Sequence, residues 1–349
     1  MKIASFFSGA GGLDLGFKNA GFEIVFANDN WEGCWETFEK NHDLPINKKS
    51  IADISPDEVP NVVGFIGGPP CQSWSLAGAM KGINDPRGKL FYNYINLIRA
   101  KKPLFFLAEN VPGILSPQHK PEFMKILQAF NEIGYNVSYR LLDAKFFGVP
   151  QERRRVIIVG YHETLGNSFG YPQPSTKLIA LKDAIGDMPA PVPAKERNKA
   201  NEKLPIPNHE YMNGGFSTIY MSRNRVRSWN EQSFTIQAGG RHAPIHPHAP
   251  KMKFIEQNKR EFVKGREHLY RRLSVRECAM IQTFPDDFIF YYKDVADGYK
   301  MIGNAVPVKL AEAIARKIKA DLKGFKMGEG VDVCQTELLS NKEAKLCPT

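Results

Sequence analysis

Short apolar runs along the first half of the chain alternate with amphipathic stretches. The amphipathic stretches cover residues 90–102 and 121–134 and show a helical repeat. Alternating strand and helix signals predict an α/β fold, with a mixed, mostly parallel sheet that carries helices on both faces. Ligands of such sheets bind beyond the carboxyl ends of the strands. The expected strands are KIASFF (2–7), EIVFA (23–27), NVVGFI (61–66), PLFFLA (103–108) and RVIIVGY (155–161).

The pattern changes near residue 171. Proline becomes frequent, helical periodicity fades and basic residues gather. We therefore expect residues 1–170 to form the main domain and residues 171–277 to form a small, irregular domain. Residues 278–325 return to the main domain through a strongly amphipathic helix over 306–322. The polar stretch 326–349 is expected to be a flexible tail.

The basic residues are concentrated rather than evenly spread. The chain has 47 Lys and Arg against 37 Asp and Glu, for a net charge of +10. Residues 221–276 hold thirteen of the former and four of the latter. An ordinary solvated surface is the alternative, but this concentration predicts a face that binds a polyanion such as nucleic acid.

Length, hydropathy and cysteines narrow the class of protein. The chain has 349 residues, 42% of them apolar, which is enough for one large or two modest cores. No apolar stretch reaches about 18 residues and the first residues lack a signal-peptide pattern, so we expect a cytoplasmic protein with no membrane partner. The five cysteines include no C-x-x-C pair, so neither a disulfide framework nor a metal site is expected.

A glycine-rich turn follows the first expected strand, in FFSGAGGLDLGF (6–17). Its glycines allow the backbone to approach a ligand closely, although a tight turn alone is an equal alternative. A dinucleotide fingerprint that starts at Gly9 would need glycine where Asp14 stands, so a nucleoside-type cofactor without phosphates fits better. Asp29 ends the second strand, where an acid would bind ribose hydroxyls, and Asp53 is a candidate for an adenine amino group.

A cysteine directly follows two prolines in GGPPCQSWS (67–75). Pro69 and Pro70 restrict the backbone before Cys71, which suits a nucleophile, although a single cysteine is more often a small buried hydrophobe. Glu109 follows the next strong strand, and neighbouring parallel strands would bring it beside Cys71. A carboxyl group does not help a thiol to ionise, so Glu109 must serve the substrate. The pair suits addition of the thiol to an electron-poor ring while the acid supports a ring nitrogen.

Two arginines lie two positions apart in QERRRV (151–156). In an extended segment, Arg153 and Arg155 point to the same side. Both are candidates to reach a carbonyl oxygen or to brace Glu109, and a surface ion pair is the alternative.

Together these residues resemble the DNA cytosine-5 methyltransferase family. The resemblance rests on six motifs in one order over nearly the whole chain: FSGAGG, GGPPCQSWS, ENV, QERRR, RRLSVRECAMIQTFPDDF and GNAVP. It implies a Rossmann-like, S-adenosylmethionine-dependent fold and a covalent mechanism without a metal, in which Cys71 adds to C6 of a flipped-out cytosine. Glu109 is then the acid at N3 and Arg155 a contact to the base, with Arg153 as a further catalytic candidate.

The resemblance also places S-adenosylmethionine and its product, S-adenosylhomocysteine. One departure is visible, because the family usually has Glu where Asp29 stands, often followed by an aromatic residue. Here Asn30 follows, and Trp31 comes one position later. We expect the shorter carboxylate to keep the ribose contact. The implied cofactor shell consists of Phe7, Ser8, Gly9, Gly11, Gly12, Asp29, Asp53, Ile54, Pro70, Asn304 and Val306.

The basic stretch is expected to choose a site on double-stranded DNA. It resembles the recognition domain of bacterial enzymes that methylate GGCC, with Thr235 and Ile236 as the family's Thr–aliphatic pair. Such an enzyme acts as a monomer, and a cognate restriction endonuclease shares its site without binding to it. Arginine suits guanine O6 and N7, although phosphate contacts are the alternative. The recognition candidates are Arg223, Arg225, Arg227, Thr235 and Arg241.

Two other functions remain as alternatives. A tRNA methyltransferase with the same motifs would carry Cys-Phe-Thr in its recognition region, and that tripeptide is absent from the sequence. A DNA-binding relative without catalysis would be expected to lack Cys71 or Glu109, and both are present.

Overall fold

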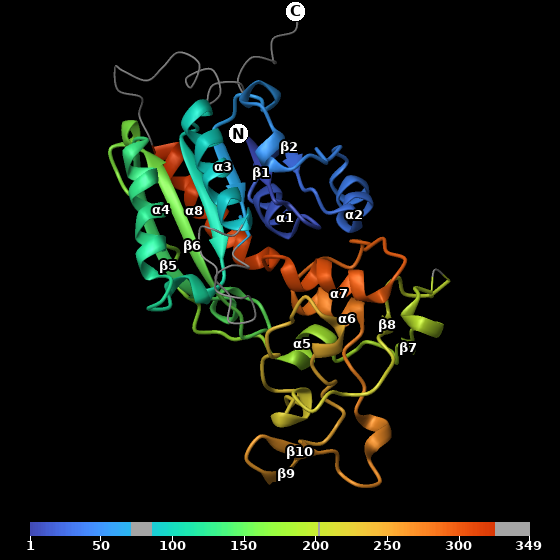
Figure 1. Ribbon diagram of the computed structural model, residues 1–349. Coiled ribbons are helices and arrows are strands. Elements are labelled where there is room, and N and C mark those ends of the chain that lie inside the picture. Colours follow the sequence, from blue (N-terminus) through green and yellow to red (C-terminus); the bar gives the residue numbers. More distant parts are fainter. Residues whose placement is uncertain (71–85, 202, 325–349) are drawn as a thin grey trace, which may run out of the picture.

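A six-stranded sheet forms the centre of the first part of the protein (Figure 1). The computed structural model describes residues 1–70, 86–201 and 203–324, so Cys71 and the expected tail 326–349 lie outside the described residues. The strands are β1 (Lys2–Phe6), β2 (Glu23–Asn28), β3 (Gly64–Gly67), β4 (Phe105–Asn110), β5 (Tyr135–Asp143) and β6 (Arg154–His162).

The strand order is β2-β1-β3-β4-β6-β5. Strands β1 to β4 are parallel, whereas β6 runs antiparallel to β4 and β5 antiparallel to β6. The mixed, mostly parallel sheet is therefore confirmed, and all five apolar runs form strands. The hydrophobic pattern did not indicate β5, which lies at the sheet edge and has mostly exposed or half-buried side chains. A half-solvated edge strand carries a weak hydrophobic pattern.

Helices cover both faces of the sheet, as expected. Because side chains alternate along a strand, Phe105 and Leu107 of β4 pack on one face, and Phe106 and Ala108 on the other. Burying each large side chain contributes about 1.5–3 kcal/mol to folding before entropy is counted. The first face meets α1 (Gly12–Asn19) and α8 (Val308–Gly324), and the second meets α3 (Pro86–Lys101) and α4 (Lys120–Glu132).

The amphipathic helix predicted over 306–322 is α8, and it packs closely against α1. Gly16 permits this contact, because a Cβ at that position would lie 2.4 Å from the Cβ of Ala311. The helix buries its apolar stripe, including Ile314 and Ile318, against the sheet. Its return to the first part of the chain is therefore driven by burial of one helical face.

Residues 171–277, called the irregular region below, contain little regular structure. Short strands and turns connect its segments, and β9 (Lys253–Glu256) and β10 (Lys259–Glu261) form a hairpin at the far end of the molecule (Figure 1). Residues 277 and 278, between which a domain boundary was expected, both lie in α6 (Val275–Ile281). The other elements from residue 171 to the start of α8 are α5 (Leu181–Ile185), β7 (Val192–Pro193), β8 (Glu210–Tyr211) and α7 (Val295–Asn304). In the first part of the chain, α2 spans Glu32–His42.

One hydrophobic cluster joins the irregular region to the rest of the protein. It contains Leu181 and Ile236 from the irregular region, Ile302 from α7, and Cys34 from α2. Cys34 and Cys278 are free and buried. Among the described residues, no helix has the length and apolar character to cross a membrane, and no group of three potential ligands could hold a metal ion.

Candidate active site

A cavity of about 470 Å³ lies at the carboxyl ends of the parallel strands. Loops after β1, β2, β3 and β4 form its walls, together with the end of α7 and the residues that follow it. This is the position expected for a ligand of such a sheet. The structure brings ten of the predicted site residues to this cavity: Phe7, Ser8, Gly9, Gly12, Asp29, Pro70, Glu109, Arg155, Asn304 and Val306.

The loop after β1 is shaped by left-handed backbone conformations. Gly9 has φ of 55° and Gly11 has φ of 83°, where glycine carries no steric penalty. Phe7 adopts φ of 53°, which a side chain rarely accepts and which marks local strain. A Cβ at Gly12 would lie 2.6 Å from the carbonyl oxygen of Val306, so only glycine allows these two loops to meet.

Asp29 holds the loops after β1 and β2 together. Its carboxylate accepts the backbone N–H of Gly9 at 2.9 Å and that of Trp31 at 2.8 Å. Burial raises the pKa of Asp29, while these donors and the charge of Lys300 oppose the rise. Trp31 lines the cavity, and the Lys300 ammonium lies 3.8 Å from the centre of a Trp31 ring. An aromatic ring is therefore present at the cavity although Asn30 follows Asp29.

Three of the predicted cofactor residues do not line this cavity. A Cβ at Gly11 would lie 2.0 Å from Nε2 of His42, so this glycine makes room for a buried ring. Asp53 is exposed on a single 3-10 turn, and Ile54 is buried in the core on one sheet face. Ile54 therefore packs against hydrophobic neighbours.

Glu109 and Arg155 meet at the floor of the cavity. Strands β4 and β6 pair so that Glu109 lies opposite Ile157, two residues beyond Arg155. The Arg155 Nε lies 2.7 Å from the Glu109 Oε1, an ion pair without the alignment of a hydrogen bond, and both side chains are 11% exposed. Asn110 donates its side-chain amide to the carbonyl of Pro69 at 3.3 Å. This bond fixes the end of β4 beside the prolines that precede Cys71.

Arg153 was expected to point to the same side as Arg155, and the structure shows that it does not. Its side chain is fully buried and donates to the carbonyls of Ile236 at 2.9 Å, Gly303 at 2.6 Å and Ala305 at 2.9 Å. The residue precedes the first residue of β6, so the alternation of that strand does not set its direction. Burial, followed by the charge of Arg155, lowers the pKa of its guanidinium. Arg153 thus joins the irregular region to the wall of the cavity.

A model of the family described as C-5 cytosine-specific DNA methylase matches residues 1–320. The chain belongs to this family. Type II methyltransferase M.MthTI of Methanothermobacter thermautotrophicus is 66% identical over 325 residues, which cover 93% of this chain and 98% of that protein. Type II methyltransferase M.FnuDI of Fusobacterium nucleatum is 53% identical over 327 residues, covering 92% and 95% of the two chains.

A solved structure of a prophage-encoded DNA modification methyltransferase from E. coli has the same fold. It is 22% identical, with a TM-score of 0.71 over 93% of this chain and 99% of that chain. The protein is therefore a DNA cytosine-5 methyltransferase of a restriction–modification system. Methyltransferases with this fold use S-adenosylmethionine.

The methyltransferase has a second cavity, of about 610 Å³, beside the first. Arg155 lines both cavities. Lys145 and Glu152 form one side of the second cavity, and Phe234 and Thr235 of the irregular region form another. Arg155, but not Glu109, is thus also reached from the side of the irregular region.

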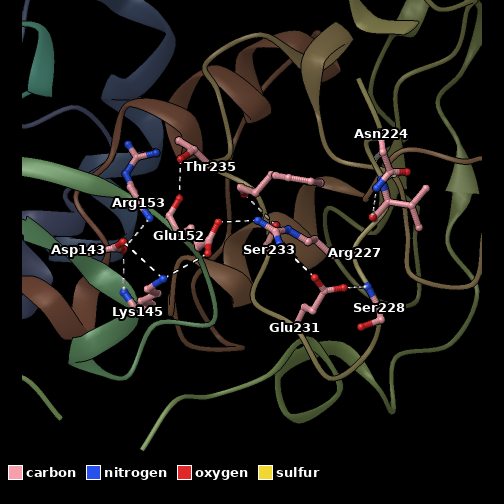
Figure 2. A network of polar contacts seen from close by, with 12 residues as sticks. Asp143, Lys145, Glu152, Arg153, Asn224, Arg227, Ser228, Glu231, Ser233 and Thr235 are labelled. Atoms are coloured by element: carbon pink, nitrogen blue, oxygen red, sulfur yellow. Dashed lines mark hydrogen bonds and ion pairs between the residues drawn. The ribbon is translucent and has the colours of Figure 1, made fainter. Parts of the chain in front are cut away.

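Figure 2 shows the polar network around this second cavity. Arg227 donates to Glu152 at 2.5 Å and to Glu231 at 3.1 Å, and its guanidinium lies 4.1 Å from the ring centre of Phe234. Glu152 also pairs with Lys145 at 3.2 Å. The charge of Arg227 is therefore compensated by two carboxylates.

The other predicted recognition residues have different surroundings. Arg225 donates to the carbonyl of Tyr220 at 2.9 Å and lies over its ring. Arg223 and Arg241 are exposed and make no hydrogen bond or ion pair within the described ranges. Thr235 donates its hydroxyl to the carbonyl of Glu152 at 2.5 Å. The four arginines therefore differ in their exposure and in their hydrogen-bond partners.

Two buried glutamines that connect distant segments were not among the residues predicted from the sequence. Gln151 accepts the N–H of Ile236 at 2.9 Å and donates to Gln282 at 3.0 Å. Gln282 in turn donates to the carbonyl of Ile302 at 2.8 Å. Both are fully buried. Both residues lie inside motifs that carry the family resemblance, QERRR and RRLSVRECAMIQTFPDDF. The sequence alone does not show that they are buried, and a buried amide needs hydrogen-bond partners that only the folded chain supplies.

Proposed function

We propose that this methyltransferase modifies a cytosine in GGCC through a covalent bond between Cys71 and C6 of the base. One observation carries the proposal: the Glu109–Arg155 pair lies at the end of β4, beside the prolines that lead into Cys71. A base that enters this cavity would meet a carboxyl group and a guanidinium, which suit its ring nitrogen N3 and its carbonyl oxygen.

The first cavity fits the nucleoside-type donor that the family uses. Its glycine loop leaves the backbone bare, Asp29 offers a carboxylate and Trp31 an aromatic ring. S-adenosylmethionine, when bound, supplies a methyl group on a sulfonium. We propose that this cavity holds it through Phe7, Ser8, Gly9, Gly12, Asp29, Pro70, Asn304 and Val306, with Gly11 shaping the loop. The exposed Asp53 carboxylate stays a candidate for the adenine amino group, whereas Ile54 supports this loop from the core.

The proposed reaction begins with the Cys71 thiolate. Its sulfur bonds to C6, and the electron pair of the C5–C6 double bond moves to C5 while Glu109 hydrogen-bonds N3. Arg155 holds the Glu109 carboxyl group in place. After C5 gains the methyl group it loses its proton to a base, the C5–C6 double bond forms again and the thiolate leaves. The target must leave the helix first, at a cost of about a few kcal/mol.

The irregular region would select the site. Arg223, Arg225 and Arg227 are the proposed guanine readers and Arg241 a further proposed DNA contact, and a bidentate pair with guanine contributes about 1–3 kcal/mol of discrimination. The GGCC assignment is supported by the resemblance of residues 207–241, with Thr235 and Ile236, to enzymes of that specificity. We further propose that the protein acts as a monomer on duplex DNA in the cytoplasm, and that methylation protects the site from a cognate endonuclease.

Bisulfite sequencing of plasmid DNA from cells that express the protein tests this proposal. We expect complete protection of one cytosine in every GGCC and conversion of all other cytosines. A Glu109→Gln variant expressed at the same level is the control for host methylation. Methylation centred on another sequence would refute the site, and no methylation by soluble protein would refute the assigned chemistry.

A further inference from the structure

A third cavity, of about 610 Å³, lies in the irregular region and at the start of α7. The backbone around Gly214 and the turn that carries Arg241 and His242 form part of its wall. Three arginines line it: Arg197, Arg241 and Arg272. Its one acidic lining residue, Asp294, pairs with Lys199 at 2.8 Å. The wall therefore carries an excess of positive charge.

Arg272 is the buried member of this group and is 3% exposed. It makes no ion pair with a carboxylate in the described part of the chain, and its Nε has no hydrogen-bond acceptor there. Its other nitrogens donate to the carbonyls of Met212 at 3.3 Å, Gly214 at 2.9 Å and Gly215 at 2.8 Å, and its guanidinium lies 4.1 Å from the ring centre of Phe216. Burial lowers the pKa of Arg272, and the charge of Arg241 contributes to the same shift. A buried cation without a counter-ion is unfavourable, so an anion in the cavity would be stabilised.

The backbone at the cavity adds further donors. Gly214 has φ of 103°, and a Cβ at Gly214 or Gly215 would meet no atom within 4 Å. The N–H groups of both glycines lack an acceptor among the described residues. Ser217 accepts the N–H of Tyr220 at 3.2 Å, and among the described residues its own hydroxyl has no hydrogen-bond acceptor. Consecutive free N–H groups beside guanidinium groups suit an oxyanion.

We propose that this cavity binds one phosphate of the DNA backbone and so fixes the register of the duplex on the irregular region. The inference rests on the proposed action on duplex DNA. A diester phosphate presents two oxygens, one for the guanidinium groups and one for the glycine N–H groups. Such a contact positions the protein without reading sequence, unlike the contacts proposed for Arg227.

Ser217→Asp is the sharpest test, because it places a carboxylate in the cavity and keeps an oxygen acceptor for the Tyr220 N–H. Ser217→Asn is the matched neutral control. We expect the Asp variant to bind GGCC duplex and scrambled duplex about tenfold more weakly, with equal losses, and to reduce the slope of log K against log salt by about 1. The Asn variant should bind as the wild type does. Equal behaviour of the two variants would overturn the proposal.

Arg197→Gln provides a second test on an exposed side chain, and Arg316→Gln on α8 removes the same charge from another part of the protein. Only the first should reduce the salt slope by about 1. Titration with inorganic phosphate, followed by ³¹P line broadening, distinguishes a free phosphate from a phosphate of the DNA backbone. If Ser217→Asp removes the broadening without any change in DNA affinity, the DNA assignment is overturned. If the wild type binds no duplex, the proposed function fails, whereas wild-type binding with an unaltered Ser217→Asp slope refutes this inference alone.

Discussion

The sheet region (1–170) and the irregular region place their functional side chains in different ways. In the sheet region, parallel strands end at one edge, so residues far apart in sequence, such as Asp29 and Glu109, line one cavity. In the irregular region, the neighbours of each side chain depend on long-range contacts. Arg227, for example, is held by Glu152, 75 positions away. This contrast teaches that regular backbone alone can bring the proposed catalytic and cofactor residues together, whereas the partners of the proposed recognition residues depend on tertiary contacts.

The Cys71→Ser variant is expected to give the largest effect, and it tests the sheet region. Without the thiolate, methyl transfer should fall by about a thousandfold or more, because a serine hydroxyl does not ionise at neutral pH. Cognate DNA affinity should stay close to wild type, since the irregular region is intact. Transfer of a labelled methyl group and a gel-shift titration measure the two quantities. Turnover near the wild-type rate would remove Cys71 from the mechanism.

Two glutamates of the sheet region compare the two sites, because Glu109 pairs with Arg155 in the first cavity and Glu152 pairs with Arg227 of the irregular region. Glu109→Gln should lower kcat by about a hundredfold with little change in DNA affinity, because it alters the group at N3. Glu152→Gln should leave kcat within about threefold and change the preference for cognate over scrambled DNA, since it releases Arg227. Steady-state kinetics on both duplexes decide between them. A similar fall in kcat for both variants would break the proposed division of roles.

Arg153 connects the two regions, and its loss should affect both. Arg153→Met removes three buried hydrogen bonds to carbonyls and should lower the free energy of unfolding by about 3 kcal/mol, with weaker cofactor binding because Gly303 and Ala305 line the cavity. Arg154→Met, at the exposed neighbour, is the control and should be nearly neutral. Urea unfolding and cofactor titration give both values. Equal stability of the two variants would contradict this role.

Arg227→Ala tests the irregular region alone. The loss of affinity should be about tenfold larger for GGCC than for scrambled duplex, as expected for a residue that reads a base. Competition binding at fixed salt measures the ratio. Equal losses on both duplexes would make Arg227 a phosphate contact.

The smallest expected effect concerns Asp14, which is fully buried under the glycine loop. Burial raises its pKa to about 7, a rise opposed by Ser5 and supported by the charge of Asp29. A raised carboxyl pKa stabilises the fold below the unfolded pKa and loses that contribution as pH rises toward about 7. Asp14→Asn should therefore gain at least about 1 kcal/mol relative to wild type between pH 4 and 8. A pH-independent difference would contradict the shift.

Most of the sheet region was predictable from the sequence, because buried strands appear as apolar runs with distinctive residues after them. The edge strand β5 was not, since its half-solvated pattern is weak. Asp14 was noted only as the residue that breaks a glycine fingerprint, and its burial depends on how α1 packs. Ile54 follows a short motif but packs in the core, which spacing alone cannot show.

The irregular region was less predictable, for physical reasons. Its charge excess was evident, but the partners of Arg227 and the burial of Arg272 arise only when distant segments meet. Arg153 and Arg155 were expected to share a side, yet the strand begins between them and only Arg155 reaches Glu109. The directions of these two side chains therefore depend on long-range packing, which the alternation of side chains along a strand does not show.

A duplex that carries 5-fluorocytosine at the target position tests the central claim most directly. The fluorine cannot leave as a proton does, so the account predicts a stable protein–DNA complex in the presence of S-adenosylmethionine, with the base attached to Cys71 in a peptide map. A protein that methylates the ordinary duplex but forms no covalent complex with the fluorinated one would contradict the account.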